Sequence, residues 1–505
     1  MMLNGATEWA AGPIRTNDEL LDFLKANRPL KRALIRSAQP PEREGGRPRD
    51  PGQWPIAYLL FVISGEPTIK RWLQKTETRI WKRCKFKKRP KYDTGHHHFA
   101  LLESFADAYR EQAMSLIARA VDKSKGLVGR DIHVDGTEAE SNARAYHDCE
   151  PGQCPNGRGP SRSPVAKTPT PTAREQRQAL AENEAELEQE IKTSERGRYG
   201  RGRRFQKKDG CWYWTSDEDA GLRAYTGKRG SKGRVWVGFY NMKAIDHYTG
   251  AVIAAINTPA YVNEADSYPL LLQHAIENSG KTPRAVIGDR GFGFNKVYET
   301  NTRKGIVSVF PWRKQTKGED RRSTATAFFD EHGIPRCPTC GGEGKQTRFS
   351  PVPYPRIWFE CLDGCGESSV ACSKGWRHLI PLPRTSETYF ALKQSHSHFE
   401  KAHWRWRDQW LVGADNPSNR PRRRGIACHE LRTQAALLLE WMIVCYREGW
   451  LGGPRINQNR KYENRAIKTL RKFLRHRVNE SLHLNDAKRQ KHKAEILKKS
   501  QKRNE

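Results

Sequence analysis

Two aspartates, Asp135 and Asp289, each end a short segment whose pattern is typical of a β-strand. Asp135 closes DIHVD (131–135), where apolar and polar residues alternate, and Asp289 closes the apolar run AVIGD (285–289). Ligand sites in open α/β sheets lie at the carboxyl ends of strands, and carboxylate oxygens suit Mg²⁺ or Mn²⁺. Two such ions about 4 Å apart can activate the attacking oxygen and stabilise the leaving oxygen in phosphoryl transfer. Both residues are therefore candidate metal ligands, although an aspartate followed by a turn is also common without any metal.

A third acidic residue, Glu400, lies in SHSHFEKAHWRWRDQW, a segment that we expect to be helical. On a helix, His396, Glu400 and Arg407 share one face, and basic groups around one acid suit the binding of phosphates. The alternative is a salt-bridged surface helix. Glu440 is a second choice for the third acid, but its setting in LLLEWMIV favours a buried, paired carboxylate. Weaker candidates near the strands are Glu138, Asp246 and Asp266.

Four cysteines have the spacing of a tetrahedral zinc site. They form C-x2-C-x20-C-x3-C, with Gly residues beside both pairs, and are Cys337, Cys340, Cys361 and Cys365. Four sulfur ligands leave no open coordination position, so a structural role is expected for Zn²⁺, with a small hairpin between the pairs. Cys372 is an alternative fourth ligand, and Cys149 and Cys154 stay unassigned.

The elements that must position these residues indicate an α/β sheet. Strands are expected at 131–135, 234–240, 251–257, 285–289 and 305–310, and a helix is expected at 266–279, ending before Gly280. Further helices are expected at 17–37, over most of 55–125, at 388–411 and at 426–448.

Several blocks in this region, in this order, resemble the catalytic core of bacterial insertion-sequence transposases of the DDE type, which have an RNase H-like fold. The blocks are IHVDGTEAES, VGFYNMKAIDHYTGAVIAAINTPAYVNEADSYPLL and AVIGDRGFG, within residues 130–312, and the resemblance resumes at 388–445. It implies cleavage at the ends of a DNA element and strand transfer into target DNA, with two Mg²⁺ (or Mn²⁺) ions. It also implies a homodimer on paired ends that carry terminal inverted repeats.

The resemblance assigns roles residue by residue. Asp135, Asp289 and Glu400 would be the catalytic metal ligands, and Arg290, His396 and Arg407 would contact phosphate or DNA nearby. The family's motif around the third acid is Tyr, two residues, Arg, three residues, Glu, six residues, Lys or Arg. This chain has Lys393 in the Tyr position and His396 in the Arg position. These departures keep three alternatives open: an inactive, domesticated DNA-binding protein, a nuclease of the same fold that cuts without joining, and, least favoured, a zinc-binding regulator.

The charge of the chain indicates a polyanionic partner. Lys and Arg number 90 against 57 Asp and Glu, a net charge of +33 over 505 residues. Nucleic acid fits such a charge, because neutralised phosphates release counterions. No apolar stretch is long enough for a membrane span, and the N-terminus does not look like a secretory signal. We therefore expect a cytoplasmic, nucleoid-associated protein of a prokaryotic cell.

The chain is expected to divide into segments along its length. They are a helical segment (1–38), a Pro/Arg-rich linker (39–54), a basic helical DNA-binding domain (55–128), the RNase H-like core in two parts (129–314, with a polar insertion at about 148–205, and 386–450), a zinc-ribbon-like module between these parts (315–385) and a basic helical tail (451–505). Residues 454–505 alone hold 17 Lys and Arg against 5 Asp and Glu. Such a tail is expected to be disordered or to order on DNA.

Overall fold

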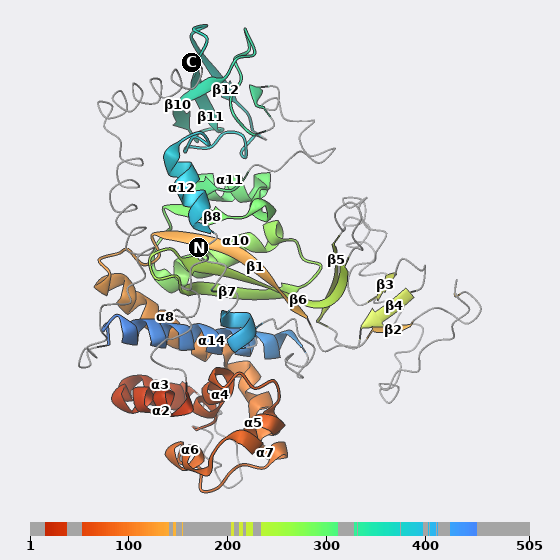
Figure 1. Cartoon of the computed structure of the whole chain (residues 1–505), viewed down its shortest axis with the longest axis vertical. Helices are drawn as coiled ribbons and strands as arrows, with labels where there is room; N and C mark the ends of the chain where they lie inside the picture. Colours follow the sequence, from red (N-terminus) through yellow and green to blue (C-terminus); the bar gives the residue numbers. More distant parts are fainter. Residues whose placement is uncertain are drawn as a thin grey trace, which may run out of the picture.

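The computed structural model of the chain places a mixed sheet between a group of N-terminal helices and a small module that contains the cysteines (Figure 1). The residues it describes are 16–37, 53–140, 145–147, 154, 204–206, 212–215, 219–225, 234–311, 328–330, 332–373, 375–396, 402, 405–410, 412 and 425–451. The tail expected at 451–505 lies almost wholly outside these residues.

The first expected helix is two helices, α2 (Asn17–Ala26) and α3 (Arg28–Ser37), separated at Asn27. Thr16 caps α2 through a capping box with Glu19. Pro29 has no amide hydrogen, so the helical hydrogen-bond ladder cannot continue unbroken through this position. The helical segment expected at 17–37 is therefore present but divided at Asn27.

The helices expected at 55–125 are present and pack around a cluster of aromatic rings. They are α4 (Trp54–Ile63), α5 (Ile69–Lys75), α6 (Thr78–Arg83), α7 (Tyr92–Leu101), the 3-10 turn η1 (Leu102–Phe105) and α8 (Ala106–Lys123). Every residue of α4 is buried. Rings of Trp54, Trp72, Trp81 and Phe99 meet edge-on or tilted in the cluster, and such pairs add to the stability of a core.

The central sheet has the strand order β5-β6-β1-β8-β9, and β7 pairs with the same edge of β6 as β5. Its strands are β1 (Asp131–Glu140), β5 (Gly221–Tyr225), β6 (Arg234–Asp246), β7 (Val252–Pro259), β8 (Ala285–Gly288) and β9 (Val307–Val309). β1, β8 and β9 run parallel, whereas β6 is antiparallel to β1 and to β7. The carboxyl ends of β1, β8 and β9 therefore point toward one edge of the sheet.

The first strand is longer than the sequence indicates. β1 passes through Asp135 and pairs with β6 as far as Glu140, so the prediction that Asp135 ends its strand was wrong. The extension, GTEAE, has no apolar run of its own and is held by its antiparallel pairing with the long partner β6. The parallel pairing with β8 does stop before Asp135, at Val134 opposite Gly288. Gly136 fits this stretch because any Cβ there would collide with the ring of Tyr240.

Two helices, α10 and α14, pack against β7, and α8 packs against both of them. α10 (Glu264–Ser279) starts after the cap Asn263 and ends at Gly280, whose φ of 64° is the left-handed conformation that glycine tolerates. α14 (Ile426–Arg447) is buried along most of its length and lies beside α8 (Figure 1). Side chains of both α10 and α14 bond to the outer edge of β7: Asn278 donates to the carbonyl of Ile253, and Trp441 donates to that of Val252. These bonds satisfy an otherwise open strand edge.

The remaining elements connect the sheet to the cysteine module. They are the 3-10 turn η2 (Arg290–Phe292), α11 (Asn295–Arg303), α12 (Glu387–Ser395) and a π-helical turn (Arg405–Gln409). The module has the three strands β10 (Gly344–Ser350), β11 (Arg356–Cys361) and β12 (Glu367–Ala371). The expected hairpin between the cysteine pairs is thus β10 and β11. A second small sheet, which was not expected from the sequence, consists of β2 (Ala145–His147), β3 (Arg204–Gln206) and β4 (Trp212–Thr215).

None of the helices in the described part of the chain is both long and apolar enough to cross a membrane.

Candidate functional site

Asp135 and Asp289 occupy equivalent positions on neighbouring parallel strands. Val134 and Gly288 form the last pair between β1 and β8, and each aspartate is the next residue along the chain. Each carboxylate accepts a backbone hydrogen bond of 2.7 Å, Asp135 from the amide of Gly136 and Asp289 from that of Gly291. The structure therefore brings together the two acids that the sequence selected.

The two carboxylates interact electrostatically. Loss of hydration raises the pKa of Asp289, although its side chain stays open to solvent, and the negative charge of Asp135 raises it further. Glu264, the first residue of α10, adds a smaller effect in the same direction, whereas the His396 ring lowers the pKa of Asp289. Two carboxylates, Asp135 and Glu264, thus raise the pKa of a third at this edge of the sheet.

A fully buried lysine lies on the strand beside Asp135. Lys243 of β6 is opposite Asp135 of β1 in the antiparallel register, and its Nζ is 3.4 Å from Oγ1 of Thr137. Burial lowers the pKa of Lys243 to about 7, the charge of Asp135 opposes this change, and the charge of Arg407 adds to it. The ammonium group also lies 5.5 Å from the ring centre of Trp406.

The structure places the three sequence-predicted basic residues around the acidic pair. Arg407 is half-buried in the π-helical turn and acts electrostatically on Lys243. His396 follows directly after α12 and acts on Asp289. Arg290 is exposed in η2, one residue after Asp289. The neighbourhood therefore combines carboxylates with cations that could bind phosphate oxygens.

A row of three histidines leads from His396 into the sheet. Nδ1 of His133 is 3.3 Å from Nδ1 of His396, and Nε2 of His133 is 2.6 Å from Nδ1 of His247. The rings stack at centroid distances of 5.6 and 4.9 Å. Since His133 is fully buried on β1, this row holds the His396 ring against the edge that carries the aspartates.

Of the two candidates for the third acid, the structure describes Glu440 and not Glu400. Glu400 lies outside the described residues, as do 397–401, 403 and 404, so the helix expected at 388–411 appears as α12 and the π-helical turn. Glu440 is buried and paired, as expected. Its carboxylate forms an ion pair with Arg405, accepts a hydrogen bond of 2.8 Å from the indole of Trp406, and accepts one of 3.0 Å from the amide of Val252. Glu440 thus stabilises the edge of β7.

Two of the weaker acidic candidates, Asp246 and Asp266, form hydrogen bonds or an ion pair within the fold. Asp246 is buried in the turn between β6 and β7 and accepts hydrogen bonds from the amides of Gly129 and Thr249. Burial raises the pKa of Asp246 to about 6. Asp266 forms an exposed ion pair of 2.9 Å with Lys296, and Glu138 is half-buried on β1.

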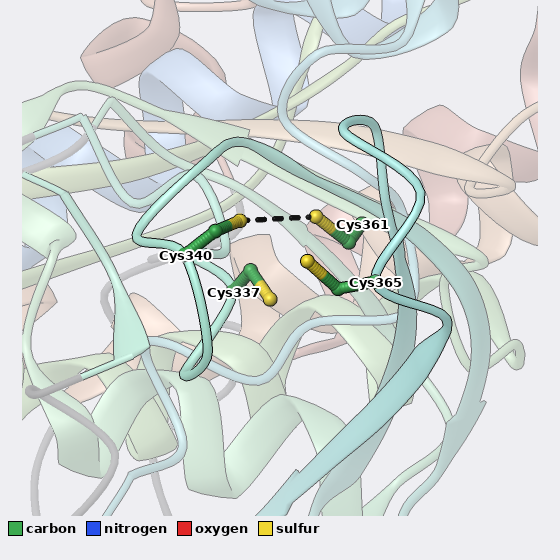
Figure 2. A group of neighbouring side chains, drawn as sticks. All are labelled: Cys337, Cys340, Cys361 and Cys365. Atoms are coloured by element: carbon green, nitrogen blue, oxygen red, sulfur yellow. Dashed lines mark hydrogen bonds between the residues drawn. The ribbon is translucent and has the colours of Figure 1, made fainter.

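The four cysteines converge at one end of the small module, and their sulfur atoms point toward one another (Figure 2). All four sulfurs lie within 4.8 Å of one another, and those of Cys340 and Cys361 are 3.4 Å apart. A tetrahedral zinc ion with sulfur ligands at about 2.3 Å requires sulfurs about 3.8 Å apart. Cys337, Cys340, Cys361 and Cys365 could therefore hold a metal ion such as zinc.

Two tight turns build this cluster. In the first, the amide of Gly341 donates to the carbonyl of Cys337, and the amide of Gly342 lies 3.4 Å from the sulfur of Cys340. In the second, the amide of Gly364 donates to the carbonyl of Cys361, and Gly364 has a φ of 86° that favours glycine.

Hydrogen bonds within the first turn favour the thiolate form of Cys337 over its thiol form. Backbone amides of Cys340 and Thr339 lower the pKa of Cys337 to about 6, which favours the form that binds metal. The other candidate sulfurs lie apart: Cys372 is half-buried against the apolar core of the module, and Cys154 is half-buried. Cys149 lies outside the described residues.

Comparison with known proteins gives no relative: no protein family matches the chain, and no curated protein is significantly similar to it.

Three residues at the carboxylate site escaped sequence reasoning. Lys243 interrupts the apolar strand segment around NMKAID, and a lysine within a buried strand is itself an unusual signal. Glu264 stands two residues before Asp266, and the sequence indicated Asp266 as the candidate acid of this stretch. His133 lies on the same strand as Asp135, and its contact with His247 depends on strand pairing.

Proposed function

We propose that this protein is a DNA transposase of the DDE type, with an RNase H-like core that cleaves element ends and transfers strands into target DNA. The observation that carries the proposal is the pair Asp135 and Asp289 at matched positions beyond the paired ends of β1 and β8. This placement supports the proposal, because ligand sites in open α/β sheets lie at the carboxyl ends of strands, and carboxylates there can hold the metal ions of phosphodiester chemistry.

The order of the elements supports the RNase H-like assignment. Leaving aside the short strand β5, β1 is the first strand of the central sheet in the chain and β8 is the fourth. The resemblance in sequence implies the first acid at the end of the first strand and the second acid at the end of the fourth. α12 follows later in the chain, before the segment that contains Glu400.

Divalent metal ions fit the residues of this site. Like charges on Asp135 and Asp289 raise the pKa of Asp289, and a bound cation would remove this repulsion. Asp135, Asp289 and Glu400 would hold Mg²⁺ or Mn²⁺. The ions would polarise the phosphodiester and activate the attacking oxygen. Arg290, His396 and Arg407 would orient the phosphate oxygens, as cations do in phosphoryl transfer.

The remaining parts of the proposal follow from charge and from the cysteine cluster. A net charge of +33 suits double-stranded DNA as element end and as target. A homodimer on paired terminal inverted repeats, in the cytoplasm of a prokaryotic cell, completes this function. The metal in the cysteine module would be zinc with a structural role, because four thiolates leave no position open for a substrate.

The test is a cleavage and joining assay on DNA from both sides of the coding sequence, with Mg²⁺, with Mn²⁺ and with EDTA. The proposal predicts metal-dependent cuts at defined ends and joined products. Cuts without joined products would indicate a nuclease built on the same carboxylates. Tight binding without cuts under any metal would indicate a domesticated DNA-binding protein, and both results would overturn the transposase proposal.

A further inference from the structure

One short loop carries the densest exposed positive charge among the residues that the structure describes between α2 and α8. Residues 85–91, between α6 and α7, have the sequence KFKKRPK, with five cations and no acid. All five basic side chains are exposed. We refer to these residues as the basic loop.

The acidic residues that the structure describes do not neutralise the charges of the basic loop. On the neighbouring helix α6, Arg79 and Arg83 form ion pairs with Asp18, and Arg83 also pairs with Asp22. Among the ion pairs between residues of the described part of the chain, none involves a cation of the basic loop. Five exposed charges of one sign repel one another, and this repulsion is relieved when a polyanion binds.

The backbone under these charges is held in place. Phe86 contacts the rings of Trp54 and Trp81 edge-on, at centroid distances of 5.0 and 5.5 Å, and its amide donates to the carbonyl of Trp81. At the other end of the loop, the guanidinium of Arg89 donates to the carbonyl of Thr76 at 3.3 Å. The loop therefore presents its lysines from a fixed path, which lowers the entropic cost of binding.

We propose that the basic loop binds the phosphodiester backbone of duplex DNA without reading its sequence. The choice of DNA as the polyanion rests on the proposed function. Lysine ammonium groups bind phosphates as point charges, and such contacts fix position without specifying bases. The loop lies at the end of the molecule opposite the strands β10–β12, with the central sheet between (Figure 1). It would anchor DNA at a distance from the carboxylate site.

Salt dependence of binding provides the test. The full-length protein and the triple variant Lys85→Gln, Lys87→Gln, Lys88→Gln are titrated with a short duplex of arbitrary sequence, in EDTA, between about 50 and 200 mM salt. Each lost phosphate contact reduces the slope of log affinity against log salt by about 0.9. The expected change is a slope smaller by about 2 to 3 and a weaker affinity at low salt.

A matched control removes the same charge elsewhere. Lys123, Lys125 and Lys304 are exposed, and Lys125 has a positive φ of 54° as Lys85 has one of 64°. Their triple change to Gln is expected to leave the slope within about one unit of wild type. Equal slopes for the loop variant and wild type would overturn the inference and leave the proposed function untouched. A loss of binding to anionic lipid vesicles but not to DNA would also overturn it. A changed slope in a protein that never cuts DNA would support the loop and contradict the transposase.

Discussion

Lys243 on β6 lies directly opposite Asp135 on β1, and the lysine is fully buried whereas the aspartate is half-buried. Burying an ammonium group is costly, and burial lowers the pKa of Lys243 to about 7. Because the charge of Asp135 opposes this effect, the two residues stabilise each other's ionised forms. The site therefore contains a cation of its own beside the proposed metal ligands.

The change Lys243→Met tests the cost of this buried cation. In wild type, the folded protein binds fewer protons than the unfolded chain between pH 7 and 10.5, so stability rises with pH across this window. The variant lacks this titration and is expected to be more stable than wild type by about 1 to 2 kcal/mol at pH 6, with a smaller difference at pH 10. Urea unfolding at several pH values measures it. Parallel pH profiles for both proteins would contradict the buried position of Lys243.

The change Asp135→Asn is expected to lower the pKa of Asp289. The negative charge of Asp135 is the second of three causes of the raised pKa; loss of hydration, the largest cause, and the smaller effect of Glu264 would remain. The pKa of Asp289 should therefore move down without returning fully to its ordinary value. Selective ¹³C labelling of aspartate carboxyls and a pH titration would measure this shift. An unchanged Asp289 pKa would mean that the two carboxylates do not interact.

The cysteine cluster is expected to bind one zinc ion per chain. Elemental analysis of the purified protein should find it in wild type, and Cys337→Ser should lose it together with solubility, because the module would lack the metal that joins its two turns. Cys372→Ser is the matched control. Cys372 packs against the apolar core of the module and is not one of the four clustered cysteines, so this variant should keep its zinc. Absence of zinc from wild type would contradict the assignment.

Glu400 and Glu440 are expected to respond differently to replacement by glutamine. Glu440→Gln removes the charge that pairs with buried Arg405, so it should lower the free energy of unfolding by about 3 kcal/mol. Glu400→Gln should abolish cleavage and keep DNA binding near normal, because a metal ligand is lost and the basic surface is not. Unfolding and cleavage are measured on both variants. Full cleavage by Glu400→Gln with none by a folded Glu440→Gln would reverse the assignment of the third acid.

The sequence predicted those parts of the fold whose signals are local. The apolar runs of β7 and β8, the helix that ends at Gly280, and the two cysteine pairs all follow from short patterns. The extension of β1 beyond Asp135 could not be predicted in this way. Its residues, GTEAE, form no apolar run and become a strand only because β6 is long enough to pair with them.

The candidate site, like the fold, was predictable only where its signals are local in the sequence. Asp135 and Asp289 share an edge because the parallel pairing of β1 with β8 stops just before both residues, although β1 itself continues beyond Asp135. The positions of Lys243 and Glu264 depend on which strand pairs with β1 and on where α10 begins, and neither is encoded in spacing along the chain. The row of His133, His247 and His396 joins three separate segments for the same reason.

The most direct test of the proposed chemistry compares Asp289→Asn with Asp122→Asn in the cleavage and joining assay with Mg²⁺. Asp122 is an exposed carboxylate in the last turn of α8, which precedes the amino end of β1. The account predicts that wild type and Asp122→Asn cut and join DNA, whereas Asp289→Asn does neither and still binds DNA. Full cutting and joining by Asp289→Asn would contradict it.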